Sequence, residues 1–494
     1  MTSIARSIPY KWLVAIAVAM ALFLEILDMT VLNTALPILG RYFSSGTSEL
    51  QWVVTAYLIS LAVFIPASGW VADRFGDKRT FVAALVIYTA ASLWAGLVGS
   101  IPELVVARAV QGVGGGLILP VGTAMLFRAF PPEERARASA LLTIPTTLAP
   151  ALGPVLGGWL ADEVSWRWIF FLKLPIAALA VVYSVLVLKP GERRAAGRFD
   201  LAGFLSGGGG LAFLLIGLEK GAREGWNVVA LSTAALGLAL GVVFVLVERR
   251  SRAPMIDLGL LRDRMFRLGN ALLLPAAGVM TGALFVVPLL VQTQLGLSAT
   301  QSGLVTSWQA VGMLAGLVIA DRVFQRIGPR SMLMAGFALV IVSQAILAGV
   351  DSAASVPWLG AALALLGFGG ALSLVPLNAA TFTGISLADT GRASAIFSTA
   401  RQLASAVSVA LMATLLAASA STRLGSLGAA ATEAERAAAS FGAFHDVFWA
   451  SAAIGALGLL LTLRVRDGDA APSRRASSGD PTRTDQPQPE PTSL

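Results

Sequence analysis

The sequence contains no cysteine and little charge, and both absences exclude large classes of protein. Without cysteine there is no disulfide framework and no thiolate that could bind a metal. Charged residues make up 13% of the 494 positions, whereas soluble domains average about 25%. Hydrophobic residues make up 56%, too many for a soluble core alone. The composition therefore predicts a protein embedded in a lipid bilayer.

Apolar runs of about 20 residues, the length at which a helix crosses a bilayer, recur along almost the whole chain. The first run has no small-residue cleavage site, so we expect it to be retained as a helix. The predicted fold is an all-α polytopic membrane protein of about fourteen transmembrane helices. Their expected positions are 12–38, 51–71, 80–99, 103–127, 138–161, 168–188, 200–219, 227–247, 269–291, 302–321, 332–350, 357–380, 395–418 and 444–464.

Lysine and arginine are distributed unevenly over the loops between these helices. If the N-terminus is cytoplasmic, most basic residues fall on the cytoplasmic side and few on the other, which is the asymmetry typical of membrane proteins. We therefore expect both termini in the cytoplasm and the chain in the plasma (inner) membrane. The formal net charge of +8 follows from this topology, so we expect no nucleic-acid partner.

The chain contains an internal repeat with an offset of about 250 residues. Gly69–Arg79 after the second predicted helix resembles Gly316–Arg330 after the tenth, and Arg137–Ala140 resembles Arg392–Ala395. Many secondary transporters are built from such repeats. We expect an N-terminal six-helix bundle over 1–190, two inserted helices and a linker over 191–265, and a C-terminal six-helix bundle over 266–466. Residues 467–494, rich in Pro, Ser and charge, are expected to form a disordered cytoplasmic tail.

Five sequence blocks, each at the matching predicted helix, resemble the motifs of one transporter family. The blocks are Leu27–Pro37, Gly69–Arg79, Leu104–Gly116, Ala149–Gly158 and Trp166–Ile176. Together they resemble the major facilitator superfamily, in its fourteen-helix drug:proton antiporter branch, over roughly residues 10 to 465. The resemblance implies transport by alternating access.

Two acids and one arginine stand within predicted membrane helices. Glu25 and Asp28 lie near the middle of the first helix, three residues apart and therefore on one face. Such acids usually face an aqueous cavity, because an ionised carboxylate is costly in hydrocarbon. Arg108, in the fourth helix, needs a partner, which Asp28, Glu25 or a backbone carbonyl can supply. We expect these three residues to couple transport to protons, with Asp28 favoured as the carrier; the alternative is a structural ion pair.

The block after the second predicted helix contains a carboxylate among basic residues. A solvated turn is one explanation, but a carboxylate at a helix end can also pair with arginine or face the N-terminus of another helix. The resemblance implies that this block latches the cytoplasmic side of the outward-facing state. The latch residues would be Gly69, Asp73, Arg74, Gly76 and Arg79. In the second copy, at Asp321 and Arg322, the glycine is displaced, so we expect a weaker latch there.

Small residues and prolines gather in the fifth predicted helix, where the resemblance implies an antiporter motif. Small residues let helices approach closely, and proline frees backbone carbonyls; tight packing without function is the alternative. The motif residues are Pro150, Gly153, Pro154, Gly157 and Gly158. The glycines of 112–116 do not form a phosphate loop, because no Gly-Lys-Ser/Thr follows them.

A mostly apolar cavity with few polar groups and one or two acids suits lipophilic, often cationic compounds. Glutamine and tryptophan are also common near membrane interfaces, so each cavity residue is a weak indication by itself. The candidate cavity residues are Asn33, Trp52, Tyr57, Gln292, Trp308, Gln309, Asn378 and Arg401.

These features predict proton-coupled efflux of lipophilic, cationic drugs or toxic compounds. We expect a monomer that is not an enzyme, holds no cofactor or metal, and binds a small-molecule substrate, protons and membrane lipids. Two alternatives stay open: a carrier that exports or imports one metabolite on the same fold, and a membrane sensor or lipid-handling scaffold that transports nothing. The Gly-Pro block argues against the first, and the buried acids and the repeat argue against the second.

Overall fold

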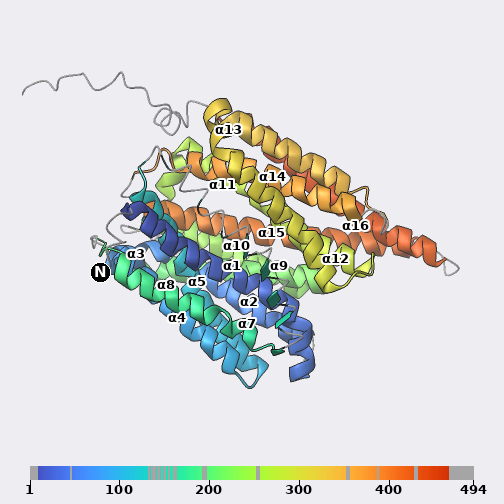
Figure 1. Ribbon diagram of the computed structural model, residues 1–494, viewed down its shortest axis with the longest axis horizontal. Helices are drawn as coiled ribbons and strands as arrows, with labels where there is room; N and C mark the ends of the chain where they lie inside the picture. The colour runs from blue at the N-terminus through green and yellow to red at the C-terminus, as the bar shows by residue number, and fades with distance from the viewer. Residues whose placement is uncertain are drawn as a thin grey trace, which may run out of the picture.

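The computed structural model describes residues 9–44, 47–131, 164–191, 197–251, 256–351, 356–386, 389–427 and 432–466, with a few single positions between 134 and 160. These residues form α-helices, with short 3₁₀ and π segments and no β-strand among them. The all-α prediction is therefore confirmed. The helices run side by side along the long axis of the molecule (Figure 1).

The N-terminal helices, a term used here for α1 to α8, follow the predicted apolar runs. Their bounds are α1 Tyr10–Phe43, α2 Thr47–Phe64, α3 Ser68–Phe75, α4 Asp77–Leu97, α5 Ile101–Ala129, α7 Trp168–Phe171 and α8 Lys173–Val187. α5 begins where Ser100 accepts a hydrogen bond from the Glu103 backbone N–H, as an N-cap should. α5 also packs against both α2 and α4, which places it at the centre of this group.

The second predicted helix is broken, contrary to our expectation of one continuous helix over 51–71. α2 and α3 meet at residues 65–67 with a bend of 58°. Pro66 lies at this point, and proline removes a backbone donor and clashes with the preceding turn. The Ser68 hydroxyl donates to the Ile65 carbonyl at 2.6 Å, which satisfies one of the carbonyls that the break frees. α3 therefore leaves the line of α2 and crosses the end of the helical bundle.

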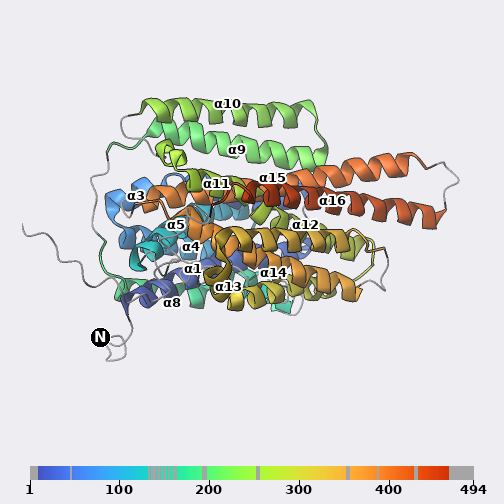
Figure 2. The ribbon, with the colours of Figure 1, turned by 90° about the horizontal axis from the view of Figure 1, so that it is seen from above.

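The two inserted helices form a hairpin. α9 Leu201–Glu224 and α10 Val228–Arg250 pack along each other, and α9 also contacts α2 and α15. Figure 2 shows the pair lying along one side of the molecule. The outward side of α10 carries exposed Leu236, Leu238, Val242, Val243 and Leu246, as expected for a surface that faces lipid.

The C-terminal helices, a term used here for α11 to α16, follow a short 3₁₀ turn, η4 Leu258–Arg262. Their bounds are α11 Arg264–Leu273, η5 Leu274–Gly278, α12 Val279–Thr293, α13 Ala299–Leu347, α14 Val356–Thr381, α15 Thr390–Gly425 and α16 Glu433–Thr462. α13 contains two predicted spans, which Gly328 separates with φ 81°. Gly76, between α3 and α4, has φ 90°. Both halves of the repeat thus use a glycine with positive φ at this turn, a conformation that other residues avoid.

Twelve helices in the described part of the chain are long and apolar enough to cross a membrane, and the bent pair α2–α3 makes a thirteenth. More than half of the remaining predicted span, 138–161, lies outside the described residues. The predicted polytopic fold is therefore confirmed. The domain boundaries near residues 190, 265 and 466 stay a prediction.

One end of the molecule, which we call the basic end, holds the basic residues Lys11, Arg74, Lys78, Arg79 and Arg128. It holds α3, the start of α1 and α4, and the end of α5, at the left of Figures 1 and 2. Here the N-terminal and C-terminal helices share one hydrophobic core, in which Phe127 of α5 packs on Phe382, with ring centroids 5.0 Å apart, and Phe382 packs on Phe397 of α15 at 5.4 Å. The basic end is therefore closed by aromatic packing. At the opposite end, α15 and α16 extend beyond the other helices (Figure 2).

Candidate functional site

Asp28 lies at the centre of a fully buried charge cluster. One carboxylate oxygen accepts a hydrogen bond from Arg108 Nη1, and the other accepts one from Lys173 Nζ. The Asp28 and Arg108 side chains are 0% exposed, and that of Lys173 is 1% exposed. The cluster therefore joins α1 to α5 and α8 through one acid and two cations.

Arg108 makes further contacts that fix its position. Its Nε donates to the Val53 carbonyl of α2 at 3.1 Å, and its Nη1 also donates to Gln111 Oε1 at 2.6 Å. The guanidinium carbon lies 4.3 Å from the centroid of the Tyr57 ring, a distance at which a cation–π interaction adds to the ion pair. The structure thus pairs Arg108 with Asp28 and with the Val53 carbonyl, two of the kinds of partner that the sequence left open.

Lys173 is the member of this cluster that our sequence analysis did not identify. It opens α8, and its Nζ also lies 5.0 Å from the centroid of the Phe170 ring. The signal was present, because a lysine inside an apolar run needs a partner for the same reason as Arg108. What the sequence does not reveal is that the partner is Asp28, 145 residues earlier.

Glu25 lies one turn before Asp28 in very different surroundings. Its side chain is buried, with 7% exposed, yet Oε2 has no hydrogen-bond partner. The Tyr88 hydroxyl of α4 donates to the carbonyl of Leu24, the residue before Glu25, at 3.0 Å. In the described part of the chain, Glu25 thus lacks the hydrogen-bonded cations that Asp28 has.

The predicted latch residues lie at the basic end, where α3 packs against the first turn of α15. Gly69 is buried there, and a Cβ built on it would lie 3.8 Å from the Arg392 Cα. Asp73 is half-buried, whereas Arg74 and Arg79 are exposed. The sequence-predicted block thus lies at a contact between the N-terminal and C-terminal helices.

Two further charged residues of this block make contacts that were not predicted. Asp77 at the start of α4 pairs with Arg128 at the end of α5, and both side chains are less than one-fifth exposed. Lys78 donates to the Val185 and Leu188 carbonyls, at 2.7 and 2.5 Å, where α8 ends. The basic end of the N-terminal helices is therefore held together by charges as well as by aromatic rings.

The antiporter motif is described only in part. Gly153 and Gly157 are buried, and a side chain on Gly153 would collide with Thr30, two residues after Asp28. The Thr30 hydroxyl also reaches the Ala149 carbonyl at 3.4 Å. The predicted fifth helix thus packs closely on α1 next to the acids. Pro150, Pro154 and Gly158 lie outside the described residues.

The candidate cavity residues are dispersed. Tyr57 is buried against Arg108, and Arg401 is half-buried in α15. Gln309 is buried in α13, and Asn378 is half-buried in α14. Trp52, Trp308 and Gln292 are exposed on helix surfaces, and no described contact connects them to the acids. The side chain of Asn33 lies outside the described residues.

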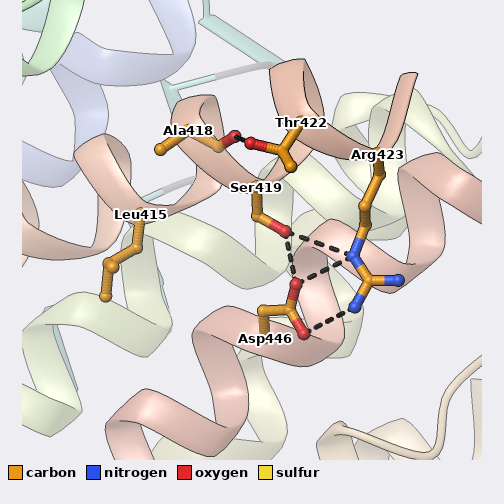
Figure 3. Close-up of a pocket in the computed structure, with 6 residues that line it drawn as sticks. All are labelled: Leu415, Ala418, Ser419, Thr422, Arg423 and Asp446. Carbon is orange, nitrogen blue, oxygen red and sulfur yellow. Dashed lines mark hydrogen bonds and ion pairs between the residues drawn. The ribbon is translucent and has the colours of Figure 1, made fainter. Parts of the chain in front are cut away.

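A separate pocket of about 550 Å³ lies at the opposite end, between α15 and α16. Figure 3 shows Arg423 directed at Asp446, and its Nε and Nη2 each donate to the carboxylate at 2.8 Å. Ser419 donates to the same carboxylate. Both charged side chains are more than 40% exposed. The arrangement is best explained as a surface clamp between two helices.

Comparison with known proteins identifies the family of this chain. The sequence profile of the Major Facilitator Superfamily matches residues 18–407 and 271–490. One relative is MdtD of Escherichia coli (strain SMS-3-5 / SECEC), which is named as a multidrug resistance protein. The two sequences are 35% identical over 320 residues, and the matched region covers 64% of this chain and 68% of MdtD. MdtD of Shigella flexneri matches to the same extent.

Solved structures support the same fold. The human organic anion transporter MFSD10 is 16% identical, with a TM-score of 0.66 over 92% of this chain and 100% of its own. The proton:xylose symporter XylE is 15% identical, with a TM-score of 0.61 over 92% of this chain and 95% of its own. The chain is thus an integral membrane protein with the architecture of a small-molecule transporter, and it belongs to the Major Facilitator Superfamily.

Proposed function

We propose that the protein exports lipophilic, cationic compounds across the plasma membrane in exchange for protons, by alternating access. The observation that carries this proposal is the pair of acids in the middle of α1. Glu25 and Asp28 are both buried in a helix that crosses the membrane. Buried acids at such a position are costly, and in transporters they commonly bind protons or cationic ligands.

The closed basic end is consistent with one state of an alternating-access cycle. The positive-inside asymmetry supports a cytoplasmic position for the basic end. On this orientation, the aromatic packing of Phe127, Phe382 and Phe397 would seal the cytoplasmic side. Opening that side requires these rings to separate and α3 to leave the start of α15. This is the movement that the predicted latch at Asp73 would control.

The substrate class rests on two arguments. MdtD is named as a multidrug resistance protein, and a buried acid without a hydrogen-bond partner on Oε2 suits a cation better than a sugar, which needs many polar groups. The likeness to the organic anion transporter and to the xylose symporter concerns the fold alone, because identity is 15–16%.

The test is transport by the purified protein in proteoliposomes with an imposed pH gradient. Ethidium and tetraphenylphosphonium serve as lipophilic cations, and xylose serves as a neutral polar solute. We expect both cations to accumulate against their gradient on the acidic side, and an uncoupler to abolish the accumulation. Accumulation of xylose alone would favour a metabolite carrier, and transport that ignores the pH gradient would overturn proton coupling.

A further inference from the structure

We propose that a pocket between the end of α10 and the start of α11 binds the phosphate-bearing headgroup of an anionic phospholipid, with an acyl chain lying along α10. The pocket has a volume of about 880 Å³ and is lined by residues of α10, η4 and α11 and of the turn before η4. The inference concerns the lipid around the protein and does not depend on the proposed transport reaction.

The pocket lies where the inserted hairpin meets the C-terminal helices. α10 ends on the side of the basic end (Figure 2), and η4 and α11 then lead the chain into the C-terminal helices. Ile256 and Phe266, on either side of η4, belong to the hydrophobic core of the basic end, and the Phe266 ring centroid lies 6.2 Å from that of Phe382. The pocket is therefore at the level where the ends of membrane helices meet the lipid headgroups.

Three arginines from three elements line the pocket. They are Arg249 of α10, Arg262 of η4 and Arg267 of α11, and all three are exposed. No ion pair joins any of them to a carboxylate in the part of the chain that the structure describes. Arg267 Nη1 donates to the Leu261 carbonyl at 3.1 Å, which orients its guanidinium. Guanidinium groups bind phosphate oxygens through pairs of parallel N–H donors, so the three arginines form a surface suited to a phosphate group.

Two acids also line the pocket, and their contacts give them a different role. Asp257 Oδ1 accepts from the Gly259 backbone N–H at 2.8 Å and caps η4. Glu248 is buried, with 4% exposed, and its Oε1 accepts from the Ile256 backbone N–H at 3.3 Å. Both carboxylates therefore hold the backbone that shapes the pocket. Residues 248–267 contain six arginines and three acids, so the segment as a whole attracts anions.

An apolar track leads from the pocket along one side of α10. Leu238, Val242 and Leu246 are spaced four residues apart, and Arg249 follows three residues later, so the four side chains lie in one row. The three apolar side chains are 48–61% exposed. At 1.5 Å per residue the row is about 16 Å long, close to half of a hydrocarbon core of about 30 Å. A phospholipid with its phosphate at Arg249 would therefore keep one acyl chain on this track within a single leaflet.

The track and the charges together define the ligand. Inorganic phosphate can use the arginines alone, whereas a phospholipid also covers the apolar track and gains the free energy of that contact. A zwitterionic phospholipid carries a cationic choline group that the arginines repel. Basic pockets between membrane helices commonly bind anionic headgroups. An anionic phospholipid is therefore the ligand that uses both features of this surface.

The test is lipid binding by the purified full chain in nonionic detergent, with bound lipids counted by native mass spectrometry. The probes are dioleoylphosphatidylglycerol, dioleoylphosphatidylcholine and inorganic phosphate. We expect phosphatidylglycerol to bind more tightly than phosphatidylcholine, and inorganic phosphate to displace it only weakly. The triple variant Arg249→Gln, Arg262→Gln, Arg267→Gln should bind phosphatidylglycerol about a hundredfold more weakly, because each arginine contributes about a factor of five.

The matched control replaces three exposed arginines that do not line the pocket, as Arg198→Gln, Arg250→Gln, Arg436→Gln. It removes the same charge and should bind phosphatidylglycerol like the wild type. Wild-type affinity in the pocket variant, or equal weakening in both triple variants, would overturn the site. Equal binding of the two phospholipids would overturn the preference for an anionic headgroup, and full displacement by an equal concentration of inorganic phosphate would assign the pocket to a free anion instead of a lipid.

Discussion

Among the described residues, three Asp–Arg pairs use the same chemistry at different depths. Asp28–Arg108 is 0% exposed, Asp77–Arg128 is 16–18% exposed, and Asp446–Arg423 is 43–44% exposed. The energy of breaking an ion pair depends on how completely its members have lost water, because a charge left alone is costly only where solvent cannot replace the partner. The three pairs are therefore expected to contribute very different free energies to the stability of the folded protein, although their residue types are identical.

The largest effect is expected for Asp28→Asn. The amide leaves Arg108 and Lys173 buried without an anion, and breaking a buried pair costs about 3–5 kcal/mol. We predict a large loss of folded protein, measured as the apparent melting temperature in detergent by size-exclusion chromatography. Asp28→Asn combined with Lys173→Met should recover part of the loss, since it removes one of the orphaned cations. An Asp28→Asn protein as stable as wild type would contradict the cluster described here.

An intermediate effect is expected for Asp77→Asn. It removes one partner of a partly buried pair between α4 and α5, for which we expect about 1 kcal/mol, the upper part of the range for exposed pairs. A double-mutant cycle with Arg128→Gln isolates the pair energy from other effects. A coupling energy as large as that of the Asp28 cluster would show that burial does not determine how strongly each Asp–Arg pair stabilises the protein.

The predicted latch is tested by Asp73→Asn, which removes charge and keeps volume. Expression should stay close to wild type, while transport falls because the contact between α3 and α15 no longer stabilises the closed basic end. Asp321→Asn, in the second copy of the block, should have the milder effect. If a well-expressed Asp73→Asn protein shows unchanged efflux, Asp73 is only part of a solvated turn and does not act as a latch.

The smallest effect is expected for Asp446→Asn. The pair it breaks is exposed to solvent at the opposite end, where water replaces the lost partner. We predict a melting temperature and a transport rate close to those of wild type. Because salt screens exposed charges, the small difference in melting temperature between variant and wild type should vanish at high salt. A strong loss of transport would indicate that the clamp between α15 and α16 takes part in the cycle.

Much of the fold was predictable because the bilayer imposes a simple constraint. Helices appear where apolar runs are long enough, and Pro66 marks the break between α2 and α3 in hindsight. The positions of Glu25, Asp28 and Arg108 within membrane helices were also evident, since charges stand out in apolar sequence. Which of these charges pair was not, because the pairing depends on how α5 and α8 are placed around α1.

Lys173 illustrates this limit. It is far from α1 in the chain, and only the packing of helices places it on Asp28. A sequence motif indicated Asp28 as the functional acid, and the fold pairs it with two buried cations. The difference between two acids one turn apart is therefore a property of tertiary structure.

Proton-driven accumulation by Glu25→Gln is the measurement that tests this account most directly. In proteoliposomes, the variant should still exchange labelled for unlabelled tetraphenylphosphonium, which requires alternating access but no proton. It should fail to concentrate the cation when a pH gradient is imposed, whereas wild type and Glu433→Gln, a change at an exposed acid of α16, succeed. Exchange without accumulation is the result we predict, and accumulation by Glu25→Gln at the wild-type level would contradict the central claim.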